Sequence, residues 1–194
     1  MSKIIDIERL RFAFGDAWVA YKADDERDLS KVKQGVDGTK DADIVALLHG
    51  AKLYLMEVTD LRAARIQNRK KLLHGDMVRE FVQKIRDTIP AIVGAFHTTG
   101  HKDQWIAFMK KLADRSEKIH VVLWMEQDAP RNLSEEKKRM AEMKTFAQDI
   151  KTHLRWLTPR VLVESLQTYE HNLPDLDVNN LPGAGQLSKR KSTA

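Results

Sequence analysis

Cysteine is absent from the 194 residues of this chain, which excludes disulfide bonds, zinc sites built on thiolates and cysteine nucleophiles. The sequence also lacks a P-loop, a dinucleotide-binding glycine fingerprint, a GxSxG elbow and an HExxH helix. It therefore gives no support to kinases, dehydrogenases, serine hydrolases or zinc proteases. No apolar run is long enough to cross a bilayer, and acidic residues interrupt the first one, so we expect a cytoplasmic protein that does not enter a membrane.

Hydrophobic residues make up 42% of the chain and charged residues 31%, which is typical of a globular domain. The length suffices for one core but not for two ordinary domains, so we expect a single domain over residues 1–171. Residues 172–194 are rich in Pro, Gly and Asn and end in a basic run, which predicts a flexible tail. The net charge of +5 fits a polyanionic partner without requiring one.

Two acidic residues lie beside or within apolar runs, where a buried strand does not ordinarily accept them. Residues 41–62 read DADIVALLHGAKLYLMEVTDLR, and the runs on either side of residues 49–51 predict a β-hairpin. If residues 49–51 form a three-residue loop with Gly50 at positive φ, Asp43 lies directly opposite Glu57. Both carboxylates then project from one face and could share a cation, whereas a two-residue loop would send them to opposite faces.

Two carboxylates at such a separation repel each other unless a cation lies between them. Oxygen-only ligation, with room left for water and phosphate, suits Mg²⁺ or Mn²⁺. Metal-dependent phosphodiesterases are built in this way. The hairpin therefore predicts a metal site formed by Asp43 and Glu57.

The same stretch resembles the core of the PD-(D/E)XK, or restriction-endonuclease-like, nuclease superfamily. An acid enters the first strand of the hairpin, and the second strand continues apolar-apolar-Glu-apolar-X. The resemblance implies that Asp43 is the motif Asp and that Glu57 is the Glu of the E-X-K element. Thr59 stands where the family has a catalytic Lys that helps position or activate the attacking water. Nearby cations are candidates to replace that Lys: Lys40, Lys52 and Arg62.

The resemblance implies an α/β, three-layer fold with a mixed central sheet flanked by helices. Apolar periodicity predicts helices over residues 4–22, 76–96, 102–115 and 134–157, with a kink or break at Pro90. Strands are predicted over residues 29–36, 41–48, 52–59, 119–125 and 160–166. The run 119–125 is apolar throughout, which is typical of a parallel strand buried on both faces.

Residues 60–73 place five cations against a single acid, directly after the second strand of the hairpin. With Lys40, these cations are candidate contacts to DNA phosphates: Arg62, Arg65, Arg69, Lys70 and Lys71. The alternative is a solvated helix start or loop.

Accessory positions also follow from the resemblance, which implies that an acid from the first helix sometimes joins the metal site. Glu26 and Asp16 are the candidates. The resemblance further implies a Gln on the helix after the catalytic strand, which points to Gln83. His97 and His101 have metal-ligand spacing, but an intervening glycine and the lack of a third ligand favour a plain loop.

Three functions remain open. The first is a Mg²⁺-dependent DNA endonuclease, as a homodimer or as a subunit of a larger complex, in bacterial antiviral defence or DNA processing. The second is a catalytically inactive nuclease-fold subunit that binds DNA or another protein, which Thr59 favours. The third is an unrelated α/β interaction domain in which Glu57 pairs with an arginine such as Arg62.

Overall fold

A five-stranded mixed sheet forms the centre of the fold. The computed structural model describes residues 3–62, 75–98, 100, 102–114 and 118–183. The strand order is β3-β4-β5-β6-β7, with these bounds: β3 (Trp18–Lys22), β4 (Ile44–Leu48), β5 (Lys52–Asp60), β6 (Ile119–Glu126) and β7 (Val161–Glu164). Strands β3, β4 and β5 are antiparallel, and β5, β6 and β7 are parallel. The predicted α/β fold with a mixed central sheet is confirmed, as is the buried parallel strand β6.

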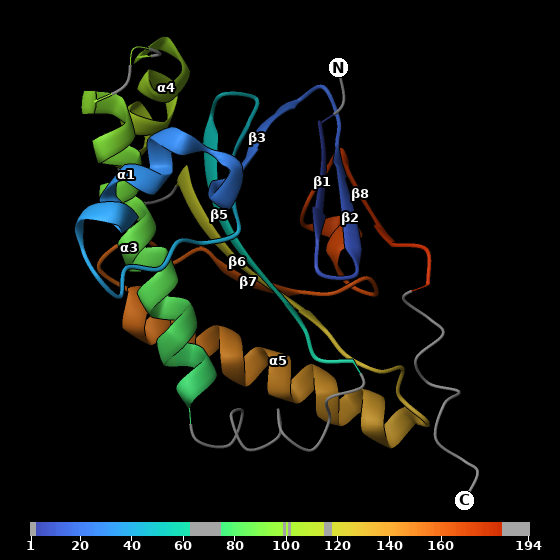
Figure 1. Ribbon diagram of the computed structural model, residues 1–194. Helices are drawn as coiled ribbons and strands as arrows, with labels where there is room; N and C mark the ends of the chain where they lie inside the picture. The colour runs from blue at the N-terminus through green and yellow to red at the C-terminus, as the bar shows by residue number, and fades with distance from the viewer. Residues whose placement is uncertain (1–2, 63–74, 99, 101, 115–117, 184–194) are drawn as a thin grey trace, which may run out of the picture.

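Helices cover one face of this sheet (Figure 1). They are α1 (Arg27–Gly35), α3 (Asp76–Thr98), α4 (Lys102–Ala113) and α5 (Leu133–Leu154). On α3, apolar residues at helical spacing, including Phe81, Ile85 and Ile92, pack with Leu55 of β5 and Leu123 of β6. Each such side chain contributes about 1.5–3 kcal/mol when fully buried, so this face alone makes a substantial core.

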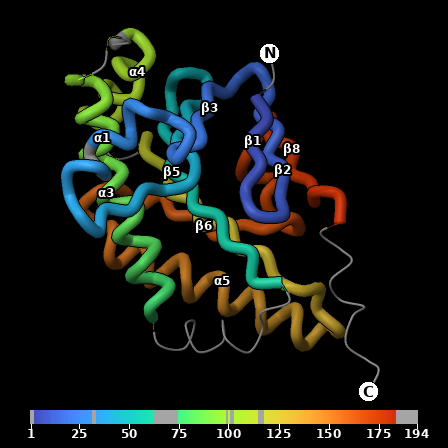
Figure 2. The backbone as a smooth tube through the Cα atoms, in the orientation of Figure 1, coloured from blue at the N-terminus to red at the C-terminus, as the bar shows by residue number. Residues whose placement is uncertain are grey.

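A second, smaller sheet covers the other face of the central sheet. It consists of β1 (Lys3–Ile7), β2 (Leu10–Phe14) and β8 (Leu176–Asn180), all antiparallel, in the order β1-β2-β8. Figure 2 shows these strands gathered on the side away from α3. Aromatic rings join the two sheets, with the Phe12 and Trp124 centroids 5.1 Å apart and a short 3-10 helix, η3 (Tyr169–His171), packed beside them. The layer of helices expected on this face is thus replaced by strands.

The helix predicted over residues 4–22 is wrong, because that segment forms β1, β2 and β3. The buried residues alternate along β2 as Leu10, Phe12 and Phe14, which is the period of a strand. Ile4, which the helical pattern would bury, is 55% exposed. Over a short segment, apolar residues spaced by two, three and four positions fit both the period of a helix and that of a strand. Pairing with other strands selects the strand conformation here.

Two further expectations are corrected. The strand predicted over residues 29–36 is wrong, because residues 29–35 belong to α1, which buries Leu29 against the helical core. Residues 172–183, expected to be part of a flexible tail, include β8, in which Leu176 and Val178 are buried. The rest of that tail, residues 184–194, lies outside the described residues.

The predicted helices over 76–96, 102–115 and 134–157 correspond to α3, α4 and α5. α3 runs without interruption past Pro90, so the break expected there does not occur. Within the described residues, no helix combines the length and apolarity needed to span a bilayer.

Candidate functional site

The β4–β5 hairpin has the predicted register. Ile44 pairs with Met56 and Leu48 with Lys52, across a loop in which His49 and Gly50 have φ angles of 50° and 60°. The three-residue loop is therefore confirmed, and the register brings residue 43 opposite residue 57.

The β5 edge is open beyond this hairpin. β4 begins at Ile44, opposite Met56, whereas β5 continues to Asp60. Residues 57–60 therefore pair with β6 on one side only among the strands of the sheet. On the open side, the Asp43 carboxylate accepts a hydrogen bond from the backbone N–H of Val58 at 2.8 Å. The Asp43 carboxylate therefore takes the place of a strand partner for Val58, just beyond the end of β4.

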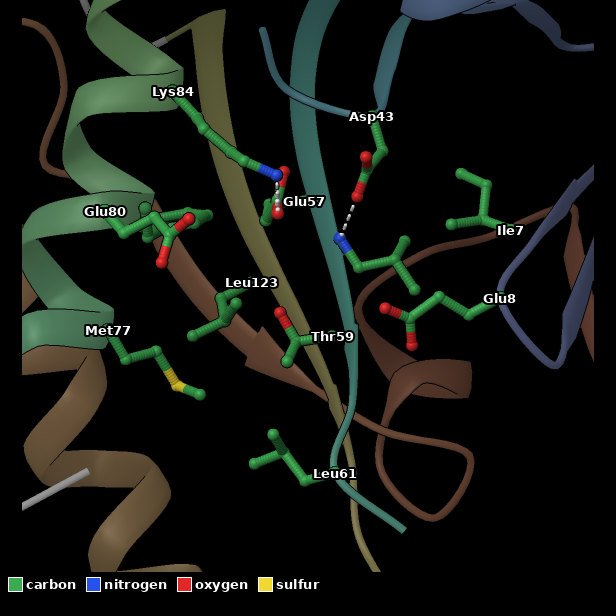
Figure 3. A pocket seen from close by; sticks show the side chains of 12 residues that line it. Ile7, Glu8, Asp43, Glu57, Thr59, Leu61, Met77, Glu80, Lys84 and Leu123 are labelled. Atoms are coloured by element: carbon green, nitrogen blue, oxygen red, sulfur yellow. Dashed lines mark hydrogen bonds and ion pairs between the residues drawn. The ribbon is translucent and has the colours of Figure 1, made fainter. Parts of the chain in front are cut away.

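Glu57 lies beside Asp43 and is buried, with 6% of its surface exposed (Figure 3). Its Oε1 forms an ion pair with Nζ of Lys84 on α3, while its buried Oε2 receives no hydrogen bond from any described residue. Burial, and then the nearby Asp43 carboxylate, raise the pKa of Glu57 to about 8 despite the opposing effect of Lys84. The carboxyl group is therefore largely protonated at neutral pH unless another cation joins Lys84.

Lys84 is a residue of this site that sequence reasoning missed, as are Glu8 and Glu80. Burial lowers the pKa of Lys84, but Glu57, Asp43 and Glu80 outweigh that effect, so the pKa lies above its usual value. A signal was present in the sequence, because Lys84 falls on the apolar stripe of α3, three residues after Phe81. A lysine at a core position requires an acidic partner.

These groups line one cavity of about 250 Å³. Its charged lining consists of four carboxylates and one ammonium: Glu8, Asp43, Glu57, Glu80 and Lys84. The Thr59 hydroxyl also faces it, and the remainder is mostly apolar, including Leu61, Met77 and Phe81. The excess of negative charge favours cations in this cavity.

The three cations predicted to replace the motif Lys lie elsewhere. Lys40 pairs with Glu80 at the rim, with 3.1 Å between Nζ and Oε1. Arg62 pairs with Asp60 at 2.6 Å, so the predicted alternative in which it neutralises Glu57 is not observed. Lys52 stands at the opposite end of β5, next to the hairpin loop.

The remaining predicted residues do not converge on the cavity. Glu26 lines a different pocket, beside Lys3 and Asp6, and Gln83 donates a hydrogen bond to the carbonyl of Gly38 at 3.1 Å. Asp16 precedes β3 at the hairpin-loop end of the sheet. His97 lies in the last turn of α3. The other predicted positions lie outside the described residues: Arg65, Arg69, Lys70, Lys71 and His101.

The described residues fit a divalent cation held by two carboxylates. The buried Oε2 of Glu57 is an acceptor without a donor, and Asp43 stands next to it. Within the described ranges, no group of three or more His, Asp or Glu side chains is arranged to hold one metal ion. Mg²⁺ is commonly held by one or two carboxylates, with water and phosphate completing its coordination.

No protein-family model matches this chain, and no significant match is found among curated proteins or solved structures. The kinship to PD-(D/E)XK nucleases therefore stays a prediction.

Proposed function

We propose that this protein is a divalent-cation-dependent nuclease of the restriction-endonuclease-like kind. In this proposal Asp43 and Glu57 hold Mg²⁺ or Mn²⁺, and Lys84 takes the role of the missing motif lysine. The observation that carries the proposal is the convergence of two carboxylates and an ammonium in one cavity, from the start of β4, from β5 and from α3. DNA as substrate, assembly as a homodimer or complex subunit, and a role in bacterial defence or DNA processing belong to the same proposal.

Each residue has a distinct task in this scheme. Asp43 is oriented by the Val58 N–H, which fixes its carboxylate at the open edge of β5. Glu57 exchanges its proton for the cation, so the raised pKa of this carboxyl becomes a preference for metal at neutral pH. The cation, when bound, polarises a phosphodiester as a Lewis acid.

Lys84 supplies the positive charge that Thr59 cannot. In the resembled family the motif Lys projects from the same strand face as the motif Glu, two residues later. Here α3 packs over that face and delivers the Lys84 ammonium to the Glu57 carboxylate. From this position the ammonium donates hydrogen bonds to a phosphate oxygen or orients the attacking water.

A second candidate function is an inactive nuclease-fold subunit that binds DNA or another protein. One observation favours it: the contact between Glu57 and Lys84 is largely buried, as a purely structural pair of side chains would be. The orphaned Oε2 of Glu57 argues in the other direction, because a structural pair would ordinarily have its second oxygen satisfied.

The test is cleavage of supercoiled and linear DNA with Mg²⁺ or Mn²⁺, alongside calorimetric Mn²⁺ binding. We expect cleavage by the native chain and a loss of ~100-fold or more in Asp43→Asn, Glu57→Gln and Lys84→Met. Lys52→Gln, on the same strand but at its far end, is the matched control and should cut normally. Metal and DNA binding without cleavage would select the inactive subunit, and no Mn²⁺ binding at all would refute the divalent-cation-dependent nuclease.

A further inference from the structure

The Asp43 carboxylate lies on a segment that leads into the central sheet but belongs to none of its strands. β4 begins at Ile44, and residues 39–43 form neither helix nor strand. The ladder between β4 and β5 therefore ends before it reaches Asp43. Two carboxylates that share a cation need positions accurate to about 0.5 Å, so the contacts that hold residues 39–43 bear directly on the site.

Two buried side chains of α3, Asp87 and Thr88, hold this segment. Oδ2 of Asp87 accepts a hydrogen bond from the backbone N–H of Lys40 at 3.3 Å. Oγ1 of Thr88 accepts one from the backbone N–H of Ala42 at 2.8 Å. The residue next to Asp43 is thus fastened to α3, across 46 residues of the chain.

The Thr88 hydroxyl makes a second hydrogen bond, which ends at Lys84. Its Oγ1 donates to the Lys84 carbonyl, one turn earlier on α3, at 2.7 Å. The hydroxyl therefore uses its donor and one acceptor position to join the backbone beside Asp43 to the backbone of Lys84. Thr88 is 0% exposed, which shields both hydrogen bonds from water.

Two further hydrogen bonds reach Asp43 itself. The Val58 N–H of β5 donates to its carboxylate at 2.8 Å, and the Ala23 N–H donates to its backbone carbonyl at 2.9 Å. These bonds relate Asp43 to β5 and to the start of the short 3-10 helix η1 (Ala23–Asp25). The Thr88 hydroxyl adds a direct connection to the turn of α3 that carries Lys84.

We propose that Thr88, supported by Asp87, is a positioning residue of the cation site. Its hydroxyl fixes Asp43 relative to Lys84, and Lys84 in turn holds Glu57. This inference rests on the proposed function, because that function assigns Asp43 and Glu57 to the cation. Residues that orient metal ligands from outside the site change metal affinity by about 10–100-fold when they are removed.

The test measures Mn²⁺ affinity by calorimetry on the full chain, beside the melting temperature in EDTA. Thr88→Val keeps the branched shape of the side chain but loses the hydroxyl, so we expect it to bind Mn²⁺ about 10–100-fold more weakly. Thr88→Ser keeps the hydroxyl and should bind Mn²⁺ with the native affinity.

Thr158→Val is the matched control. Thr158 is also 0% exposed, and its Oγ1 likewise joins two backbone groups, donating to the Ile119 carbonyl at 2.6 Å and accepting from the Arg160 N–H at 3.0 Å. This hydroxyl lies at the start of β6, away from the cavity. Thr158→Val should lower the melting temperature as Thr88→Val does, and should leave Mn²⁺ affinity unchanged.

The outcomes separate this inference from the proposed function. If Thr88→Val loses melting temperature but keeps the native Mn²⁺ affinity, the hydroxyl serves the fold alone, and the inference is overturned while the proposed function stands. Equal losses of affinity in Thr88→Ser and Thr88→Val would also overturn it, because the hydroxyl would not be the cause. If the native chain binds no Mn²⁺, the proposed function fails and this inference with it.

A second variant decides the matter if Thr88→Val does not fold. Asp87→Ala removes the acceptor of the Lys40 N–H and releases the same segment two residues farther from Asp43. We expect it to weaken Mn²⁺ binding, by less than Thr88→Val would. Native affinity in Asp87→Ala would then overturn the inference.

Discussion

Strand β5 carries two buried carboxylates, three residues apart and on opposite faces, and they are treated in opposite ways. Asp60 is 1% exposed at its side chain and accepts hydrogen bonds from Arg9 and from Arg62. Burial raises the pKa of Asp60, but the hydrogen bonds from Arg62 and the charges of both arginines outweigh it, and the pKa falls below its ordinary value. The Glu57 carboxyl group pairs with one lysine, Lys84, and its Oε2 receives no hydrogen bond from a described residue. Its pKa is raised to about 8.

The difference separates a carboxylate that holds the fold together from one that is left incomplete. Asp60 joins the small sheet to β5, because Arg9 comes from the β1–β2 turn and Arg62 also pairs with Asn180 of β8. Glu57 pairs with Lys84 of α3, and its Oε2 receives no hydrogen bond from a described residue, so the carboxyl group is only partly compensated. A fully satisfied buried charge indicates structure, whereas a partly satisfied one at a cavity indicates a ligand.

The largest effect is expected at Asp60. Asp60→Ala leaves two partly buried arginines, Arg9 and Arg62, without their shared carboxylate and loosens the β1–β2 turn, so we expect a loss of about 3–5 kcal/mol in the free energy of unfolding. Urea denaturation in EDTA measures it. Asp6→Asn, which breaks an exposed pair with Arg11, is the control and should cost at most about 1 kcal/mol. Equal stability losses in Asp60→Ala and Asp6→Asn would contradict the structural role assigned to Asp60.

A smaller effect on the free energy of unfolding, with the opposite dependence on pH, is expected from Glu57. The folded chain keeps a proton on Glu57 up to about pH 8, whereas the unfolded chain releases it near the ordinary pKa of 4.5. Stability from this group is therefore fully present below pH 4.5 and is lost as the pH rises toward 8, by about 2–4 kcal/mol. Asp60, with a lowered pKa, loses its contribution instead as the pH falls.

Metal-free urea denaturation at pH 5 and pH 8 checks this prediction. Glu57→Gln removes the titrating group while keeping its shape, so its stability should change less between the two pH values than that of the native chain. If the native protein and Glu57→Gln show the same pH dependence, Glu57 titrates normally and its incomplete pairing has no energetic consequence.

The local geometry of the site was predictable from sequence, because it is set by short-range rules. The loop at residues 49–51 and the alternation along β5 fixed the register that places Asp43 opposite Glu57. Nothing in that reasoning required a distant segment. Register in a hairpin follows from turn length and from which residues must be buried.

The missed features all depend on contacts between segments far apart in the chain. Lys84 meets Glu57 across 27 residues, and Arg9 meets Asp60 across 51. β2 is a strand because β8, near the other end of the described chain, completes its sheet, so the local pattern of residues 4–22 was ambiguous. Periodicity describes one element at a time, whereas these residues are defined by which elements meet.

The smallest effect in stability, and the sharpest test of Lys84, comes from Thr59→Lys. Thr59 is half-buried at the cavity, on the same strand face as Glu57, so a lysine there has room for its stem and can place its ammonium beside Glu57, and it should change the free energy of unfolding by less than about 1 kcal/mol. In a Lys84→Met background the same substitution returns a cation to Glu57 from the strand. If Glu57 needs only a nearby ammonium, the double variant Thr59→Lys/Lys84→Met should regain part of the stability, and of any cleavage, that Lys84→Met loses.

Lys52→Gln in the same background is the control, since it alters β5 at its far end. No regain in the double variant would mean that the position of the ammonium on α3, and not its charge alone, is what Glu57 requires.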